Sequence, residues 1–201
     1  MLFNRRLSNL FTITFITALS ALTSQAVLAG WTLDNDASSL YYVTSKAASV
    51  SEVNSLGGLS GGINDDGNAE VTISLGTVDT AIEIRNERMR DIVFEVASYP
   101  LASVSLMTDV SMLKSLAAGE SMSMAYEATV DLHGATQVVT LDVLVSGLKE
   151  GGLLVTLARP LIIHAAAFGL ADSVEQLREI AGLPSINNNV VVDFTLQFDA
   201  D

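Results

Sequence analysis

Few side chains in this sequence have the chemistry that catalysis or metal binding requires. The chain has no cysteine, which removes thiolate nucleophiles, disulfides and sulfur metal ligands, and its two histidines are His133 and His164. Neither histidine belongs to a His-x-x-x-His or Glu-x-x-His pattern, and no Gly-x-Ser-x-Gly motif marks a nucleophilic serine. Asp65 and Asp66 lie in a stretch rich in glycine and asparagine, which indicates a solvated turn. These residue types favour binding over catalysis and predict no metal site or cofactor.

Three arginines, Arg85, Arg88 and Arg90, lie within one short stretch. Two interpretations of this cluster stay open. In the first, the guanidinium groups form surface ion pairs with the acidic residues beside them, Glu83, Glu87 and Asp91. In the second, the arginines line the mouth of a cavity and bind the polar head group of a lipid, because the planar guanidinium group matches oxygen-rich partners.

A set of aliphatic, methionine and phenylalanine side chains forms the second candidate site, the lining of an apolar cavity. Methionine is flexible and fills irregular space without fixing its shape, which suits an adaptable lining. Core packing explains any one of these residues more simply, so the hypothesis depends on the whole set. The cavity candidates are Val71, Ile73, Leu75, Met89, Ile92, Phe94, Met107, Met122, Met124 and Phe168.

Strands must position these side chains, and the clearest strand signal lies in residues 126–145. Apolar and polar residues alternate there on both sides of a tight Leu132-His133-Gly134-Ala135 corner. A period of two is typical of strands and predicts a β-hairpin whose arms each have one apolar face. The His133 ring is expected to meet solvent at the corner. The inward residues are Tyr126, Ala128, Val130 and Leu132 in the first arm, and Val139, Leu141, Val143 and Val145 in the second.

Similar patterns predict the remaining elements. Two opening strands are expected on either side of a polar turn at residues 34–38. Apolar residues recur at helical spacing in 86–97, and a second helix is predicted over 172–181 with Asp172 or Ser173 as its cap. Apart from the hairpin, the expected strands cover 31–33 and 40–45, which are the two opening strands, and 56–63 with bulges, 70–75, 102–106, 110–116, 153–158 and 190–198.

These elements indicate an all-β fold. A flat sheet of about eight antiparallel strands would leave exposed edges, and closure removes them. We therefore predict an extended, lipocalin-like antiparallel barrel of about eight strands with two short helical insertions. A barrel of this size can be filled by side chains or can hold one small ligand, and the sequence leaves that choice open.

The first 29 residues have the pattern of a signal peptide. Arg5 and Arg6 precede an apolar run at 7–22, and Ala26-Val27-Leu28-Ala29 is typical of a cleavage site. Cleavage is expected after Ala29, with Ala26 as second choice, which leaves one domain over 30–201. The run is shorter than the roughly 20 apolar residues of a spanning helix, so no transmembrane segment is expected in the mature chain. A periplasmic location is predicted, with secretion into the medium as the alternative.

The formal net charge is −13, and loss of Arg5 and Arg6 with the signal peptide would bring it to −15. Such an acidic surface repels the phosphates of nucleic acids. Nucleic acid is therefore excluded as a partner.

Several short segments, in the same order along the chain, are similar to the YceI-like family of exported lipid-binding proteins. The strongest are the block from Asp79 to Arg90 and the Leu-His-Gly corner. The matching segments are Trp31-Thr32-Leu33-Asp34 with Ser38-Ser39, Leu59-Ser60-Gly61, Val78-Asp79-Thr80, Ile84-Arg85-Asn86-Glu87-Arg88-Met89-Arg90, Tyr99-Pro100, Leu132-His133-Gly134 and Ala167-Phe168-Gly169-Leu170. The resemblance implies a lipocalin-like barrel whose apolar tunnel takes a polyisoprenoid chain, such as the tail of a quinone or a polyprenyl lipid.

Residues and resemblance together predict an exported, non-catalytic carrier or sequestering protein for an isoprenoid lipid or a similar long apolar molecule. One alternative is a filled barrel that acts as an interaction module. The other is a lipid-modifying enzyme, which would need an inward-pointing acid or base. Asp131, Asp142 and Asp193 lie on the polar faces of their strands and are expected to point outwards. Homodimer formation is left open.

Overall fold

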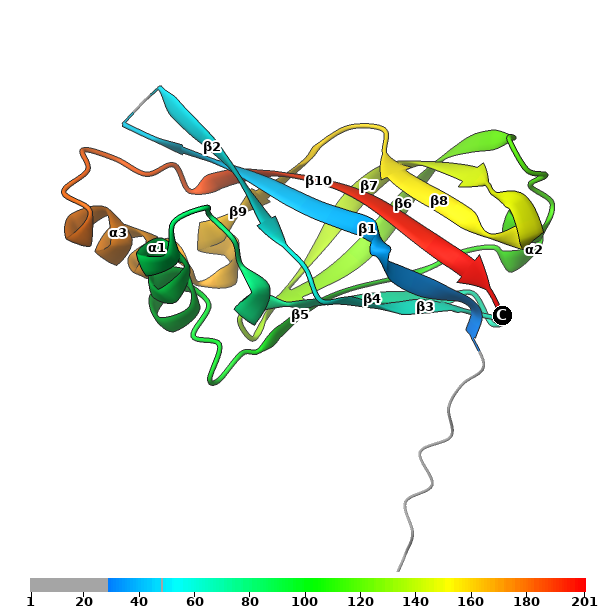
Figure 1. Ribbon diagram of the computed structural model, residues 1–201, viewed down its shortest axis with the longest axis horizontal. Coiled ribbons are helices and arrows are strands. Elements are labelled where there is room, and N and C mark those ends of the chain that lie inside the picture. Colours follow the sequence, from blue (N-terminus) through cyan, green and yellow to red (C-terminus); the bar gives the residue numbers. More distant parts are fainter. Residues whose placement is uncertain (1–28, 48) are drawn as a thin grey trace, which may run out of the picture.

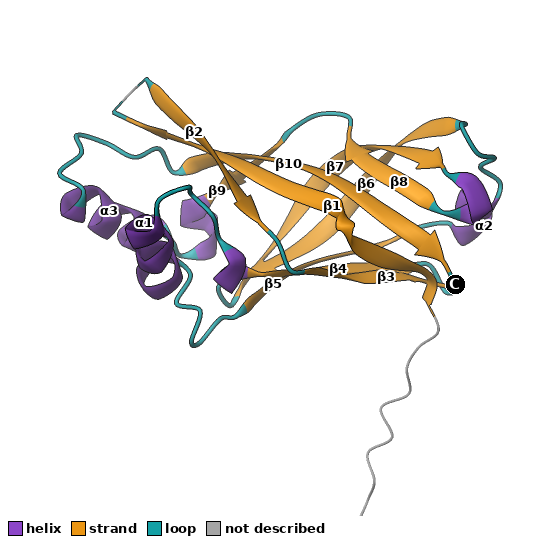
Figure 2. Ribbon diagram, in the orientation of Figure 1, coloured by secondary structure: helices purple, strands orange, loops and turns teal. Residues whose placement is uncertain are grey.

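A computed structural model describes residues 29–47 and 49–201. All but the last residue of the proposed signal peptide lie outside the described residues, and the first strand begins at Ala29. The described chain is an elongated, mostly β structure with small helical elements gathered at its two ends (Figure 1; Figure 2). The strands are β1 (Ala29–Lys46), β2 (Val50–Leu56), β3 (Leu59–Asn64), β4 (Asn68–Ser74), β5 (Leu101–Met107), β6 (Ser121–Leu132), β7 (Ala135–Gly147), β8 (Leu153–Leu157), β9 (Leu161–His164) and β10 (Asn189–Ala200).

The helices are short and lie between strands. Helices α1 and α3 lie at one end of the molecule, and α2 lies at the other (Figure 1). The helical elements are α1 (Glu83–Arg88), α2 (Val110–Lys114), α3 (Ala171–Ile180), the π-helical turn η2 (Met89–Val93), and the 3₁₀ turns η1 (Leu75–Thr77), η3 (Lys149–Gly151) and η4 (Ala165–Phe168). Within the described residues, no helix is both long enough and apolar enough to cross a membrane.

Pairing between the first and last strands closes the sheet. Antiparallel neighbours follow the order β1, β3, β4, β5, β6, β7, β8 and β10, and β10 then pairs with β1. The predicted lipocalin-like antiparallel barrel is confirmed. Strands β2 and β9 extend the barrel at the end that carries α1 and α3, where they pair with β1 and β10 respectively.

The central hairpin forms as predicted from strands β6 and β7. Residues His133 and Gly134 form its two-residue corner with φ of 55° and 72°, and positive φ at both positions is the signature of a type I′ turn. The apolar face is turned inwards, with Ala128, Val130 and Leu141 buried. The expectation that His133 meets solvent is wrong: its side chain is only 14% exposed, because the ring packs 4.3 Å from the Tyr99 ring.

The turn predicted at residues 34–38 is wrong, because β1 continues through it as one 18-residue strand. The polar stretch instead forms a bulge, and the pairing with β10 shifts between Asp34 and Ser39. An Asp34 carboxylate oxygen accepts hydrogen bonds from the backbone amides of Asp36 at 2.9 Å and Ala37 at 3.2 Å. The local turn chemistry is therefore satisfied inside the strand.

The strand predicted over 110–116 is also wrong. This segment forms α2, whose N-terminus is capped by the Asp109 carboxylate through Ser111 and Met112 amides. The helix turns Leu113, which is 3% exposed, into the core. A short apolar run is compatible with a strand or with a helix. Here the Asp109 cap and the burial of Leu113 favour the helix.

Smaller departures occur at other boundaries. The broken strand predicted over 56–63 is the end of β2 followed by β3, and the sequence pattern missed β9 and most of β2. The helix predicted over 86–97 consists of α1 and η2, and begins three residues earlier. Helix α3 begins at Ala171 and has Leu170 at its cap position, so Asp172 and Ser173 do not cap it.

Phe168, in η4, anchors the helical end of the core. Its side chain is 2% exposed and packs in a cluster with Leu75, Val93, Phe94 and Leu170. Phe168→Ala should lower the free energy of unfolding by about 3–5 kcal/mol, because removal of a buried phenyl ring loses burial and leaves a cavity. Ile162→Ala is the control, since Ile162 is 53% exposed on β9. Equal losses for the two variants in chemical denaturation would contradict this packing.

Candidate functional site

Two neighbouring cavities lie in the interior of the barrel. The larger has a volume of ≈ 330 Å³ and lies at the end covered by α1 and α3, and the smaller has a volume of ≈ 110 Å³. Leu40, Ile73 and Val104 line both cavities. The larger volume falls within the range of small-molecule sites, about 300–1,000 Å³. The interior is therefore hollow along part of its length.

The two cavities follow one another along the barrel and make up its interior space. On β5 and just beyond it, the alternate residues Ala102, Val104, Leu106 and Thr108 line this space in turn. Six residues of strand at about 3.3 Å each span about 20 Å. A space of this length and width suits an extended chain better than a compact ring system.

The lining changes from apolar to polar along β1. Leu40, Tyr42, Thr44 and Lys46 all line the larger cavity, because alternate residues of a strand share one face. The smaller cavity has an apolar lining apart from Thr108 and Tyr126, whose hydroxyl groups are hydrogen-bonded to each other at 2.6 Å. The interior thus has an apolar depth and a polar end beside the β1–β2 hairpin.

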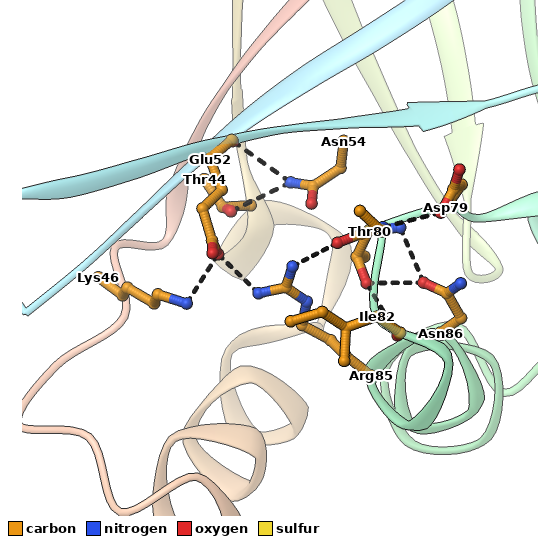
Figure 3. A network of polar contacts seen from close by, with 10 residues as sticks. Thr44, Lys46, Glu52, Asn54, Asp79, Thr80, Ile82, Arg85 and Asn86 are labelled. Carbon is orange, nitrogen blue, oxygen red and sulfur yellow. Dashed lines mark hydrogen bonds and ion pairs between the residues drawn. The ribbon is translucent and has the colours of Figure 1, made fainter.

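Arg85 is the centre of the polar end. It reaches from α1 towards the β1–β2 hairpin (Figure 3), where Nη1 donates to the Glu52 carboxylate at 2.6 Å. Its Nη2 donates to the carbonyl oxygen of Thr80. Lys46 Nζ lies 2.8 Å from the same Glu52 carboxylate oxygen. Hydrogen bonding from Lys46, together with the charges of Arg85 and Lys46, lowers the pKa of Glu52 below its usual value.

A buried Thr80–Asn86 pair holds the segment that carries Arg85. The Asn86 side-chain oxygen accepts hydrogen bonds from the Thr80 amide at 2.8 Å and the Thr80 hydroxyl at 2.6 Å. Both residues are less than a tenth exposed. Buried polar groups that satisfy one another fix local geometry, so this pair sets the position of Arg85 relative to the hairpin.

The predicted cavity residues divide into two groups. Val71 lines the smaller cavity, Ile73 lines both, and Leu75, Met89 and Phe94 line the larger. The other candidates lie elsewhere: Ile92, Met107, Met122, Met124 and Phe168.

The members of the second group lie outside the two cavities for different reasons. Met107 is 60% exposed, because it directly follows the inward-facing Leu106 in a strand and so points outwards. Met124 packs against the core and accepts a hydrogen bond from the Tyr126 hydroxyl. Phe168 is fully buried among neighbouring side chains. Strand parity therefore explains Met107, whereas Met124 and Phe168 are packed into the core.

The arginine cluster is divided in the same way. Arg85 and Arg88 line the larger cavity. Arg90 lies outside it and pairs with Glu83 at 2.7 Å, as the surface interpretation expected. The partner of Arg85 was missed, because Glu52 lies 33 residues earlier and no local pattern connects them.

Sequence patterns also missed much of the wall of the larger cavity. Tyr42, Thr44, Lys46 and Asn54 come from the β1–β2 hairpin, and Leu161 and Ile163 come from β9. Helix α3 contributes Val174 and Leu177. The alternation in 40–45 placed Leu40, Tyr42 and Thr44 on one face, but their inward direction depends on the pairing of β1 with β10.

Asp131, Asp142 and Asp193, which the sequence places on the polar faces of their strands, do not line either cavity. Asp131 and Asp193 are exposed, and Asp142 forms an ion pair with the exposed Arg159. In the part of the chain that the structure describes, no group of three or more His, Cys, Asp or Glu side chains is placed to hold a metal ion.

A closed antiparallel barrel with an apolar interior and a polar mouth defines a lipocalin-like binding domain. The model of the YceI-like domain family matches residues 31–198, and the chain belongs to this family. No curated protein matches the sequence significantly.

Solved structures agree with this assignment. A polyisoprenoid-binding domain from Saccharophagus degradans, implicated in plant cell wall breakdown, is 39% identical and superposes with a TM-score of 0.84 over 86% of this chain and 99% of that one. BcnA of Burkholderia cenocepacia is 18% identical, with a TM-score of 0.64 over 82% and 98% of the two chains, and shares the fold.

The ion pairs of Glu52 predict an acid-sensitive mouth. Since the pKa of Glu52 is lowered in the folded state, its stabilising contribution is present above the ordinary value of 4.5 and is lost as the pH falls below it. When the pH is lowered from 7 to 3.5, the melting temperature of Glu52→Gln should therefore fall by less than that of the wild type. Circular dichroism measures this difference.

Glu70→Gln is the matched control. Glu70 is exposed on β4, and its side chain has no ion pair or hydrogen bond among the described residues. This variant should follow the wild type across the same pH range. The same acid response in all three proteins would show that Glu52 contributes no acid-sensitive stability.

Proposed function

We propose that this protein is an exported, non-catalytic carrier or sequestering protein that binds an isoprenoid lipid, or a similarly long apolar molecule, in its barrel. The observation that carries the proposal is the pair of neighbouring cavities in the barrel, which are largely apolar and share Leu40, Ile73 and Val104 in their linings. A polyprenyl chain is long, narrow and apolar. It therefore matches this space in shape and in polarity.

Burial of the tail supplies enough free energy for binding. Each buried methylene group gains about 0.8 kcal/mol, and an isoprene unit of five carbons gains several times that amount. A few units bound in the apolar space offset the cost of ordering the chain. Tail length should consequently affect affinity more strongly than any single polar contact.

One relative supports the same ligand class. The Saccharophagus degradans domain is described as polyisoprenoid-binding, and the alignment with it extends over nearly its whole length. A non-catalytic role is supported by the state of the ionisable groups at the mouth. Glu52, the carboxylate in the lining, is held by Arg85 and Lys46, which leaves it poorly placed to accept a proton from a substrate.

The proposed export has the periplasm as its destination. It is supported by the N-terminal sequence pattern of residues 1–29 and by the acidic composition of the rest of the chain. We expect a bacterium that expresses the whole sequence to release the protein in its periplasmic fraction, with a mass that begins at Gly30. An intact N-terminus in the cytoplasmic fraction would contradict export. The alternative, secretion, would place the processed protein in the medium.

Native mass spectrometry tests the ligand directly. Protein purified from that fraction without detergent should carry a stoichiometric lipid, and organic extraction followed by fragmentation should release a prenyl ladder. A ligand-free mass that persists after exposure to quinones and polyprenols would contradict the carrier function. It would instead favour the filled-barrel interaction module.

Val104 offers a way to close the interior space, because it lines both cavities. Val104→Phe should weaken the binding of a long prenyl chain by at least tenfold, because the larger ring blocks the passage between the two cavities. A short prenyl chain should bind with little change. The control is Ser105→Phe, since Ser105 is the exposed neighbour on the outer face of β5. Equal affinities for long chains in both variants would show that the ligand does not pass Val104.

A further inference from the structure

Two buried hydrogen-bond donors at the larger cavity have no partner within the described chain. They are the Tyr42 hydroxyl and the Arg85 Nε–H, and both residues line the cavity. Tyr42 is only 6% exposed. Buried polar groups are nearly always hydrogen-bonded, since an unmade bond costs free energy. These two donors therefore indicate the position of an acceptor that the protein does not itself supply.

Tyr42 lies where the lining changes character. It follows the apolar Leu40 and precedes Thr44 on the inner face of β1, and it is opposite Val192 on β10 and Asn54 on β2. A ligand whose tail occupies the apolar depth would place its first polar atom at this level. The hydroxyl is thus located at the boundary between tail and head.

Both terminal nitrogens of Arg85 have protein partners. Nη1 donates to Glu52 and Nη2 donates to the Thr80 carbonyl group, and each keeps a second N–H. Nε is the guanidinium nitrogen that has no partner among the described residues. Lys46 and Arg88 line the same cavity beside Arg85, against the carboxylate of Glu52, so this lining is positive overall and suits a head group with acceptor oxygens.

Burial keeps Tyr42 in its donor form. Desolvation raises the pKa of the phenol above its usual value, and the nearby positive charge of Arg85 opposes this shift only partly. The hydroxyl group is therefore protonated throughout the physiological pH range. A protonated phenol offers one hydrogen bond to an acceptor oxygen.

We infer that Tyr42 recognises the head group of the ligand: its hydroxyl, together with Arg85 Nε–H, donates to an acceptor oxygen of the head group attached to the tail. This inference rests on the proposed binding of a long apolar ligand. It adds a preference of the protein among ligands that have tails of equal length but different head groups. A headless hydrocarbon leaves both donors unpaired, whereas a quinone carbonyl group or a phosphate group supplies the acceptor oxygen.

Three probes with the same tail separate these cases: a tetraprenyl benzoquinone, the tetraprenyl hydrocarbon and tetraprenyl diphosphate. Dissociation constants are measured by native mass spectrometry on the whole mature protein. The wild type should bind the quinone and the diphosphate more tightly than the hydrocarbon. Tyr42→Phe should weaken quinone binding about three- to tenfold, the effect of one hydrogen bond, and should leave hydrocarbon binding unchanged or slightly tighter.

Tyr41→Phe is the matched control. Tyr41 is the adjacent tyrosine on the same strand, but it is 48% exposed on the outer face, so this variant should match the wild type with all three probes. The melting temperature of ligand-free Tyr42→Phe gives a second readout. It should equal or exceed that of the wild type, because the lost hydroxyl makes no hydrogen bond within the described chain.

The outcomes separate this inference from the proposed function. If the wild type binds the hydrocarbon as tightly as the quinone and the diphosphate, head-group recognition by Tyr42 is overturned while the carrier function stands. Equal loss of all probes in Tyr42→Phe, with a lower melting temperature, would show a structural role and would also overturn it. If the wild type binds none of the three, the proposed function itself fails.

Discussion

Antiparallel pairing between β1 and β10 is the interaction on which the rest of this structure depends. It joins residues such as Trp31 and Ala200 from opposite ends of the described chain and removes the two edges that the sheet would otherwise expose. Closure also determines which face of each strand is internal. Apolar residues at every second position then line an enclosed space, and their polar neighbours meet solvent.

The same two strands explain why one end of the barrel differs from the other. Near Trp31, β1 pairs with β3, but beyond the bulge it pairs with β2. Strand β10 likewise pairs with β8 near its C-terminus and with β9 at the other end, beside α1 and α3. The barrel is therefore enlarged at this end, and α1 and α3 cover it (Figure 2). The ion pair between Arg85 and Glu52 connects α1 to the β1–β2 hairpin. The polar mouth therefore also holds these two parts of the structure together. Binding chemistry and local stability consequently share the same side chains.

The strands with regular alternation were predictable from the sequence, because the two faces of such a strand have different solvent exposure. The hairpin with its His133-Gly134 corner and the face of Val71, Ile73 and Leu75 illustrate this. The segment at 110–116 was not predictable in this way, since a short apolar run suits a strand or a helix equally. Its helical state depends on the cap from Asp109 and on the space that the closed barrel leaves for Leu113.

By itself, the sequence determined the family resemblance, the antiparallel barrel and the absence of cysteine chemistry, since each depends on local composition or on a period of two along the chain. Only the tertiary structure decided what surrounds the interior space. Glu52 meets Arg85 across 33 residues, and Tyr42 turns inwards because β1 pairs with β10 more than 140 residues away. Contacts of this kind are set by closure of the barrel, and closure is a property of the whole chain that no local pattern contains.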